Sequence, residues 1–407
     1  MHKYTHRIGT KLLKVECKNG VPLSNQHVDI CQKKHKFLFG CSEFTAVKYK
    51  NNEFNGSEKE FFEERYSKFL NLFNSVTLPF YWRNFEPVKG QPDTVRLKQA
   101  AQWWKSKGLT VKGHPLCWHT LAPPWLLELD NSDIIKEQLN RINREVTEFT
   151  GLIDMWDVIN EVVIMPIFDK YDNGITRICK EMGRVKLVSE VFKATKQSNP
   201  NAVLLINDFN TSEDYARLIE SLLEAEVPID AIGVQSHMHQ GYWGIEKTET
   251  VLERFSRFKL PIHFTENTLV SGHIMPKEIE DLNDYQLPEW PTTQEGEERQ
   301  AREAAMHYKT LFAHPLVESI TWWDFVDGAW LGAPSGILTK ENRVKPIYNE
   351  IYNLVKNEWW LNEQSFTTDE NGFINLKGYY GEYELNFKGN TVSFELNNLD
   401  EKITLNV

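Results

Sequence analysis

Two glutamates each stand at the end of an apolar, β-rich run of the sequence. Glu161 closes the run IDMWDVINE, and Glu266 lies near the end of LPIHFTEN. Glycoside hydrolysis needs such a pair of carboxyl groups, one to protonate the leaving oxygen and one to attack the sugar or to activate water. The simpler alternative is that each glutamate pairs with an arginine or caps the following helix, because most charged side chains are exposed or paired.

Other apolar runs also end in polar or aromatic side chains. If the runs are parallel strands of a closed barrel, their C-terminal ends meet on one face and these side chains surround the two glutamates. Titratable groups that gather around a carboxyl pair favour an active site over two unrelated ion pairs. The residues concerned are His114, Trp118, His119, Asn160, Asp208, Asn210, Gln235, His237, Trp322, Trp323 and Asp327.

The pattern of runs predicts the elements that position these residues. Amphipathic segments such as 57–73, 132–151, 185–197 and 296–312 separate short apolar runs. Nearly continuous apolar strands that alternate with helices indicate a parallel sheet buried on both faces, and eight is the number that closes into a barrel. We therefore predict an α/β fold, a (β/α)8 TIM barrel, with strands in 37–43, 74–82, 109–119, 153–161, 203–210, 229–239, 260–267 and 318–325.

The two ends of the chain have a different pattern. Residues 8–34 contain a strand, an Asn19-Gly20 turn and a second strand, and residues 365–407 alternate between apolar and polar positions. Neither end is long enough to be predicted as an independent domain, so we expect the two ends to pack together as a small accessory β layer. The predicted division is an N-terminal β-hairpin segment at 1–34, the catalytic barrel at 35–358 and a C-terminal β segment at 359–407.

Composition narrows the class of protein. The 407 residues carry a net charge of −11, with 41% hydrophobic and 25% charged residues, which is typical of a globular protein and lacks a basic nucleic-acid footprint. No apolar stretch has the length of a membrane span, and we expect a monomer without a cofactor. Five irregularly spaced cysteines argue against a disulfide framework or a zinc knuckle. Localisation stays open between the cytoplasm and a secreted form that has lost its signal.

Six motifs together are similar to glycoside hydrolase family 10, whose usual activity is that of an endo-1,4-β-xylanase. The resemblance covers residues 37–355 and implies a TIM barrel, a retaining mechanism and a role in the breakdown of plant cell-wall polysaccharide. The motifs occur in the family's order and are KGHPLCWH (112–119), WDVINE (156–161), INDFN (206–210), GVQSHMH (233–239), HFTEN (263–267) and the segment 323–330.

The resemblance also implies roles for single residues. Glu161 matches the family's acid/base and Glu266 its nucleophile, so we expect a raised pKa for Glu161 and not for Glu266. The substrate-binding set is Asn160 on the sugar 2-hydroxyl, His119 in the subsite nearest the cut, Gln235 and His237 as supports of the nucleophile, and Trp323 and Trp330 as an aromatic floor. For the two tryptophans, a plug of the barrel core is the alternative.

One segment departs from the family pattern. After NSVT the family usually has Glu-Asn, a Lys and a Trp before a Glu-Pro pair, whereas this chain has the shorter LPFYWRNFEP at 78–87. We expect Tyr81 and Trp82 to replace the missing sugar contacts or to close that subsite. Asn267 and Leu331 are further departures. A β-glycosidase that acts on short or aryl-linked glycosides other than xylan is therefore an alternative function.

Two other functions remain open from the sequence. Histidines near strand ends could indicate a metal-dependent barrel hydrolase, but such enzymes usually carry His-x-His on the first strand, and here it is at 237–239. A carbohydrate-binding barrel without turnover is disfavoured because both glutamates are retained.

Two further segments have alternative explanations. The acidic stretch 277–300 is either a solvated loop or a wall over the site that presents Trp290. Tyr379, Tyr380 and Tyr383 are better explained by packing than by glycan binding.

Overall fold

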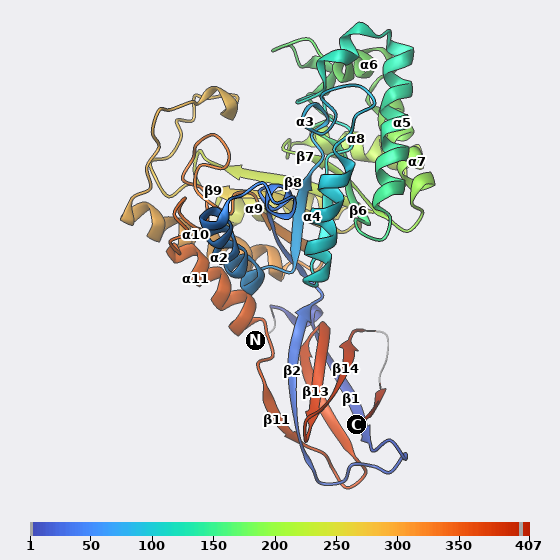
Figure 1. Ribbon diagram of the computed structural model, residues 1–407, viewed down its shortest axis with the longest axis vertical. Coiled ribbons are helices and arrows are strands. Elements are labelled where there is room, and N and C mark those ends of the chain that lie inside the picture. Colours follow the sequence, from blue (N-terminus) through green and yellow to red (C-terminus); the bar gives the residue numbers. More distant parts are fainter. Residues whose placement is uncertain (1–2, 399–401) are drawn as a thin grey trace.

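A closed parallel barrel of eight strands forms the upper part of the molecule (Figure 1). The structure is a computed structural model and describes residues 3–398 and 402–407. All eight predicted runs are barrel strands, which confirms the predicted fold class. In their order around the barrel they are β10 (Val317–Trp322), β3 (Leu38–Ser42), β4 (Ser75–Pro79), β5 (Thr110–His114), β6 (Met155–Asn160), β7 (Val203–Asp208), β8 (Ala231–Met238) and β9 (Ile262–Leu269).

Helices surround the barrel, so its strands are buried on both faces. All eight residues of β9 are buried, as expected for a strand with the barrel interior on one side and helices on the other. The α-helices are α1 (Ala46–Lys50), α2 (Gly56–Leu72), α3 (Trp82–Phe85), α4 (Thr94–Ser106), α5 (Asn131–Phe149), α6 (Gly174–Met182), α7 (Arg184–Ser198), α8 (Glu213–Glu224), α9 (Gly244–Ser256), α10 (Gln294–Ala313) and α11 (Pro346–Asn353). Shorter turns are η1 (Thr5–Arg7), η2 (Pro124–Glu128), η3 (Met165–Ile167), η4 (Leu282–Asp284) and the π-helical η5 (Leu354–Glu358).

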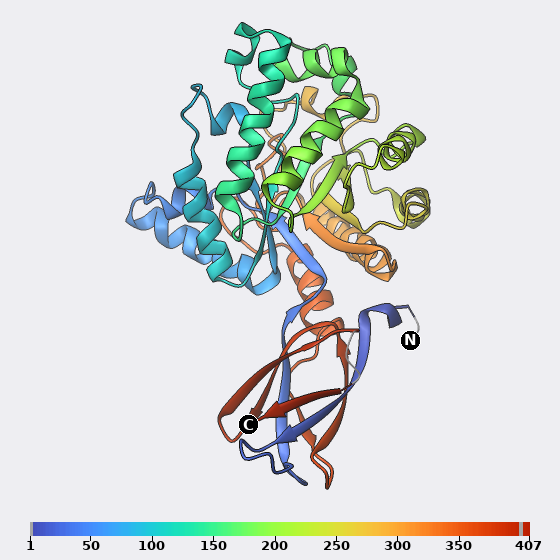
Figure 2. The ribbon, with the colours of Figure 1, turned by 90° about the vertical axis from the view of Figure 1, so that its right-hand side faces the viewer.

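The two chain ends form a β-sandwich that lies below the barrel in Figure 2. One sheet has the order β12-β1-β15 and the other β11-β2-β13-β14. A separate apolar cluster, which includes Leu13, Ile30 and Leu376, fills the space between the sheets. The strands are β1 (Ile8–Glu16), β2 (His27–His35), β11 (Gln364–Thr367), β12 (Phe373–Tyr379), β13 (Gly381–Phe387), β14 (Asn390–Leu396) and β15 (Lys402–Asn406).

The expected N-terminal hairpin is wrong in one respect. A turn does form at Asn19-Gly20, where Gly20 has a φ of 81°. The two strands that it joins then enter different sheets, because β1 pairs with β12 and β15 whereas β2 pairs with β11 and β13. The physical reason is that their apolar faces, such as Leu13 and Ile30, meet across the sandwich core.

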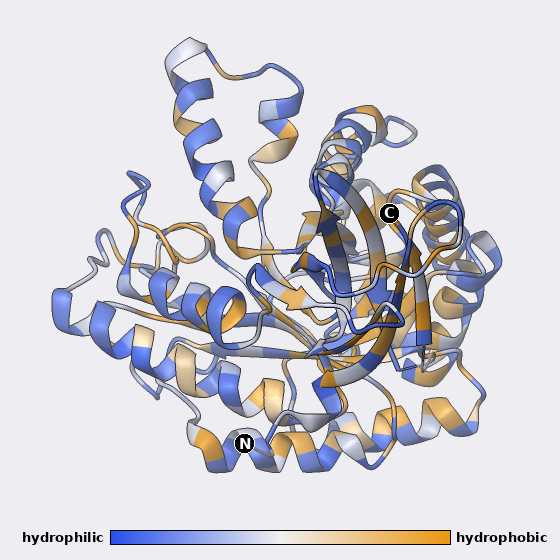
Figure 3. Ribbon diagram, turned by 90° about the horizontal axis from the view of Figure 1, so that it is seen from below, coloured by the Kyte–Doolittle hydropathy of each residue, from blue (hydrophilic) through white to orange (hydrophobic). Residues whose placement is uncertain are grey.

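The sandwich lies at the end of the barrel where the strands begin. β2 ends at His35 and β3 starts at Leu38, so the chain enters the barrel directly from the sandwich. Active sites of TIM barrels occupy the opposite face, where the strands end. Seen from the sandwich end, hydrophobic and hydrophilic residues alternate along its strands (Figure 3), which is the pattern of strands with one buried face.

Arg7 joins the sandwich to the barrel. Its guanidinium donates hydrogen bonds to the carbonyl oxygens of Phe312 (3.2 Å), His314 (2.7 Å) and Val317. The same group lies 4.7 Å from the ring centroid of Phe37 and 5.1 Å from that of Phe312, and burial lowers its pKa to about 10. The junction therefore depends on one buried cation whose partners are backbone carbonyls and aromatic faces.

The C-terminal tyrosines pack within the protein. Tyr383 is fully buried in the sandwich core and donates a 2.6 Å hydrogen bond to the carbonyl of Tyr379. Tyr379 contacts the rings of His35 and Phe312 at the junction, and Tyr380 packs against the sandwich cluster. The packing explanation favoured by the sequence is thus confirmed.

Two further observations concern the cysteines and the helices. All five cysteines are free thiols, so no disulfide framework is formed. Within residues 3–398 and 402–407, none of the helices has both the length and the apolar character that crossing a bilayer requires.

Replacement of Arg7 tests the junction. Arg7→Ala leaves the carbonyls of Phe312, His314 and Val317 without their donor, and we expect the free energy of unfolding to fall by roughly 2–4 kcal/mol. Urea denaturation followed by circular dichroism measures this change. The matched control is Arg257→Ala, which removes an exposed arginine paired with Glu213 and should cost less than about 1 kcal/mol. Equal effects of the two variants would contradict the role given to Arg7.

Candidate active site

The two glutamates come from strands on different sides of the barrel mouth. Glu161 directly follows β6, and Glu266 lies within β9. Glu161 has a φ of 56°, which is uncommon for a residue other than glycine, and its backbone N–H donates a 2.8 Å hydrogen bond to the carbonyl of Asn207. Such a left-handed residue costs conformational energy and is found preferentially at functional sites.

Neutral donors surround the carboxyl group of Glu161. Trp118 Nε1 donates to Oε2 at 2.8 Å, while Asn160 Nδ2 and Gln235 Nε2 approach Oε1 at 3.2 and 3.3 Å. Burial raises the pKa of Glu161 to about 8, the charges of Glu266 and Asp208 add to this effect, and the bonds from Trp118 and Gln235 oppose it. Glu161 therefore retains a proton near neutral pH.

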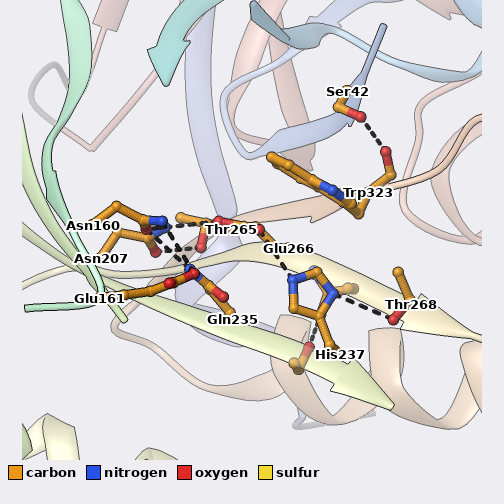
Figure 4. Close-up of polar contacts among 12 residues, drawn as sticks. Ser42, Asn160, Glu161, Asn207, Gln235, His237, Thr265, Glu266, Thr268 and Trp323 are labelled. Atoms are coloured by element: carbon orange, nitrogen blue, oxygen red, sulfur yellow. Dashed lines mark hydrogen bonds and ion pairs between the residues drawn. The ribbon is translucent and has the colours of Figure 1, made fainter. Parts of the chain in front are cut away.

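Histidines surround the carboxyl group of Glu266. His237 Nε2 lies 3.1 Å from Oε2, His114 Nδ1 lies 4.0 Å from Oε1, and Asn207 Nδ2 donates to Oε1 at 2.8 Å (Figure 4). Burial by itself would raise the pKa of Glu266, but the charge of His114 and the bond to His237 outweigh it and lower the pKa. The two pKa shifts have the predicted directions, raised at Glu161 and lowered at Glu266.

Asn207 connects the two halves of the site and was missed in the sequence. Its Nδ2 donates to Asn160 Oδ1 and to Glu266 Oε1, both at 2.8 Å, and its Oδ1 accepts from Thr265 Oγ1 at 2.6 Å. Gly233 makes room for it, because a Cβ there would lie 2.4 Å from Asn207 Oδ1. The available signal was the alternation of β7, since the residue before Asp208 must point to the opposite face.

Asp208 lies behind Glu161 on that opposite face. Its Oδ2 accepts from the backbone N–H of Val163 at 3.0 Å, and its Oδ1 accepts from that of Asn210 at 2.9 Å. Burial raises the pKa of Asp208 to about 7 against these hydrogen bonds. Asp208 therefore fixes the segment that follows Glu161 and adds to the negative potential that Glu161 experiences.

Asp157 and Lys112 form a buried ion pair that holds His114 in position. Asp157 Oδ2 lies 2.7 Å from His114 Nδ1 and 2.8 Å from Lys112 Nζ, and all three side chains are buried. Burial alone would raise the pKa of Asp157, but Lys112 and His114 outweigh it and lower the pKa. The network positions the imidazole whose charge favours an ionised Glu266.

Aromatic rings form the walls around the carboxyl pair. Tyr81 has its ring centroid 5.7 Å from those of His114 and Trp118, and Trp323 lies 5.2 Å from His114. Trp330 lies 4.5 Å from His237. Burial and the charges of Glu266 and Glu161 raise the pKa of Tyr81, as expected for a phenol that faces both carboxyl groups. Such rings can stack on the faces of a pyranose.

The prediction for Trp82 is wrong. Trp82 is 4% exposed, donates from Nε1 to Glu86 Oε2 at 3.0 Å and has the guanidinium of Arg141 4.8 Å from its ring. The reason is the short helix α3, which starts at Trp82 and directs this side chain into the protein while Tyr81 remains at the mouth. Only Tyr81 of the expected pair reaches the site.

Two other predicted residues have contacts that differ from expectation. Gln235 Nε2 donates to Glu161 Oε1 (3.3 Å) and to Asn160 Oδ1 (3.0 Å), so it contacts Glu161 and not Glu266, whereas His237 does contact Glu266 as expected. His119 is buried beneath Phe168, at 4.5 Å between ring centroids, and burial lowers its pKa to about 4. His119 therefore lies at the edge of the site in its neutral form.

The histidines of the mouth do not converge on a metal position. His237 faces Glu266, while His239 Nδ1 lies 3.2 Å from Thr268 Oγ1. Throughout the part of the chain that the structure describes, no three His, Cys, Asp or Glu side chains are grouped so that they could hold a metal ion. The donors of the site are arranged as hydrogen-bond partners of two carboxyl groups.

Comparison with known proteins identifies the same family as the motifs. The model for glycosyl hydrolase family 10 matches residues 42–354. The anti-sigma-I factor RsgI6 of Acetivibrio thermocellus is 24% identical over 385 residues, 92% of this chain and 44% of that protein. Endo-1,4-beta-xylanase B of Thermotoga neapolitana is 26% identical over 294 residues, 68% of this chain and 78% of that protein. The chain thus spans less than half the length of RsgI6.

Solved structures share the fold. A GH10 structure from Paenibacillus barcinonensis covers 79% of this chain and 95% of its own, with a TM-score of 0.64 at 21% identity. Xylanase 10B of Thermotoga petrophila RKU-1 in complex with xylobiose has a TM-score of 0.63 at 21% identity, again over 79% of this chain and 95% of its own.

The two pKa values predict a bell-shaped pH dependence. Activity should rise as Glu266 ionises, at a pH below the usual carboxyl range near 4.5, and fall as Glu161 loses its proton near pH 8. Asp208→Asn removes a negative charge behind Glu161, so its pKa should drop and the basic limb should move to lower pH. The profile of kcat/KM on an aryl β-glycoside measures both effects.

Asp214→Asn is the matched control, because Asp214 is an exposed residue in the following helix α8. Its profile should coincide with that of the unmodified protein. A basic limb that stays in place in Asp208→Asn would contradict the electrostatic role of Asp208.

Proposed function

The chain belongs to glycosyl hydrolase family 10, and on this premise we propose that it is a retaining glycoside hydrolase that cleaves β-linked, xylan-like polysaccharide. The observation that carries the proposal is the pair of buried carboxyl groups with opposite pKa shifts, raised at Glu161 and lowered at Glu266. A barrel that only bound sugar would have no need to divide these two roles.

The site supports a two-step reaction. Protonated Glu161 gives its proton to the glycosidic oxygen while ionised Glu266 attacks the anomeric carbon, so the bond to the leaving group breaks and a glycosyl ester forms on Glu266. Glu161, now a carboxylate, takes a proton from water, whose oxygen attacks the same carbon and releases Glu266. Two inversions leave the sugar with its original anomeric configuration.

Hydrogen bonds within the site hold both carboxyl groups in position for this two-step reaction. Asn207 is bonded to Glu266 and to Asn160, and Asn160 in turn reaches Glu161. These contacts of Asn160 with Asn207 and Glu161 support the role that the family resemblance implies for it, a hydrogen bond to the sugar 2-hydroxyl. Pre-organised donors of this kind need no rearrangement as charge develops, which lowers the barrier.

The walls of the site affect which substrates it prefers. Residues 78–87 lack the Glu-Asn and Lys of the family pattern, and Trp82 is buried, which leaves Tyr81 as the aromatic group on that side. Each lost hydrogen bond to a sugar hydroxyl is worth on the order of 1 kcal/mol. We infer weak binding two sugars from the cut on the non-reducing side and a preference for short, decorated or aryl-linked β-xylosides over unsubstituted xylan.

A series of linear xylo-oligosaccharides tests this preference. Because the distal subsite lacks its polar contacts, kcat/KM should rise by less than about tenfold from two sugars to four. Steady-state kinetics with each oligosaccharide measure the increase. A steep rise along the series would mean that Tyr81 serves as a stacking platform in place of the lost bonds, and the preference for short substrates would then be wrong.

Azide rescue distinguishes the roles of the two carboxyl groups. Glu266→Ala should lose nearly all turnover, and added azide should give the α-glycosyl azide, because the anion attacks directly in place of the nucleophile. Glu161→Ala should keep activity on substrates with good leaving groups and give the β-glycosyl azide. Proton NMR of the products identifies each anomer.

Glu148→Ala, which removes an exposed glutamate on α5, is the control and should behave like the unmodified protein. Interchanged anomers would reverse the assignment of proton donor and nucleophile. An inverted first product from the unmodified protein would exclude the retaining mechanism.

A further inference from the structure

Two segments on different sides of the barrel mouth are joined by an ion-pair network. Lys170 lies in segment 162–173, which follows Glu161, and its Nζ is 2.5 Å from Asp281 Oδ2 and 2.7 Å from Asp284 Oδ1. The two aspartates lie in segment 270–293, which follows β9. Two strands, β7 and β8, separate β6 from β9 in the barrel, so ion pairs between the segments that follow β6 and β9 span part of the mouth.

The segment that carries Lys170 is anchored at two positions before it, Val163 and Phe168. Phe168 packs on His119 at 4.5 Å and on Tyr171 at 4.9 Å between ring centroids. His119 follows β5, which is opposite β9 in the order of the barrel. Upstream, Arg184 donates a 2.6 Å hydrogen bond to the carbonyl of Val163. Lys170 is thereby held at the edge of the mouth that faces β9.

The segment that carries the aspartates forms a wall at the barrel mouth and has a small apolar core of its own. Trp290 is 6% exposed, donates to the carbonyl of His273 at 3.0 Å and packs with Val270 and Met275. Gln240 Nε2 ties the segment to the end of β8 through the carbonyls of Pro276 (2.9 Å) and Ile279 (2.8 Å). Trp290 is therefore a core residue of this wall, so of the two alternatives left open by the sequence the segment is a wall, but one that keeps Trp290 in its own core.

We propose that Lys170, Asp281 and Asp284 form a clasp that closes the mouth over the ends of β7 and β8 and thereby selects for short leaving groups. The inference rests on the proposed function and names a determinant of its substrate reach. Tyr81 and Trp323 flank the site from β4 and β10, so the part of the substrate beyond the cut extends toward β7 and β8, under the clasp. A long polymer must open the clasp, whereas a small aglycone passes beneath it.

The clasp is weak enough to open. The side chains of Lys170, Asp281 and Asp284 are 39%, 34% and 65% exposed, and exposed ion pairs of this kind contribute little to stability and are screened by salt. The hydrogen bonds to Asp281 and Asp284 raise the pKa of Lys170, so it stays charged at neutral pH. The segments on either side are anchored independently, so loss of the clasp should leave the fold intact.

The experiment replaces the cation. Lys170→Glu puts a carboxylate opposite Asp281 and Asp284, and Lys170→Ala removes the cation without adding charge. The control is Lys98→Glu, because Lys98 has a similar exposure and pairs with Glu148 away from the mouth. For each protein, kcat/KM is measured on soluble linear xylan and on an aryl β-xyloside, at low salt and at about 0.5 M NaCl.

The ratio of kcat/KM on xylan to kcat/KM on the aryl xyloside should rise by about threefold or more in Lys170→Glu. This is the factor expected for the loss of an exposed ion pair. Lys170→Ala should show a smaller rise, and Lys98→Glu none. Salt should increase the ratio of the unmodified protein and leave that of Lys170→Ala unchanged. A ratio that is the same in all proteins would overturn the clasp as a substrate filter.

Hydrogen–deuterium exchange tests the clasp independently of turnover. Segments 166–173 and 277–286 should both exchange faster in Lys170→Glu than in Lys98→Glu, because each is restrained by the other. Unchanged exchange in both segments would overturn the clasp. Should the unmodified protein cleave neither substrate, the proposed function fails while exchange alone decides whether the clasp exists.

Discussion

The site depends on one electrostatic constraint, which is that two buried carboxyl groups, Glu161 and Glu266, lie close enough for the charge of Glu266 to raise the pKa of Glu161. Burial raises the cost of ionising both, and their mutual repulsion adds to it. The surroundings resolve the competition in favour of Glu266, because His237 and His114 lie on its side while Glu161 is met by the neutral donors of Trp118 and Gln235. This asymmetry gives the pair its chemistry.

The barrel supplies that asymmetry through five consecutive strands. β5 brings His114, β6 leads to Asn160 and Glu161, and β7, β8 and β9 bring the remaining polar groups to the same level. Close packing around these groups restricts which side chains fit. At Gly233, for example, any larger side chain would displace the amide of Asn207. Hydrogen bonds between strands hold these groups, from β6 to β7 (Asn160 to Asn207), from β7 to β9 (Asn207 to Glu266) and from β8 to β9 (His237 to Glu266), so the site is pre-organised before a substrate arrives.

The sequence predicted the barrel and the carboxyl pair because both follow from strong, local patterns. Apolar runs identify strands, and the residue type at the end of each run identifies what reaches the mouth. Asn207 was missed because it lies one position inside a strand end, where only the direction of the side chain separates it from Asp208. Trp82 was misplaced because α3 is too short to leave a periodic signal, and β1 and β2 were wrongly paired because a turn between strands does not reveal which sheet each one enters.

Family membership and loop structure constrain different parts of the function. The sandwich is attached where the barrel strands begin and is joined through Arg7, so it does not line the mouth. Within the mouth, the polar residues at the strand ends follow the family motifs, whereas residues 78–87 depart from the family pattern. Since loops at this face vary while the strand ends keep the chemistry, one catalytic centre can serve substrates of different length. Under the proposed function, Tyr81 on one side and Lys170 on the other limit the length of carbohydrate that is accepted, while Glu161 and Glu266 break the glycosidic bond.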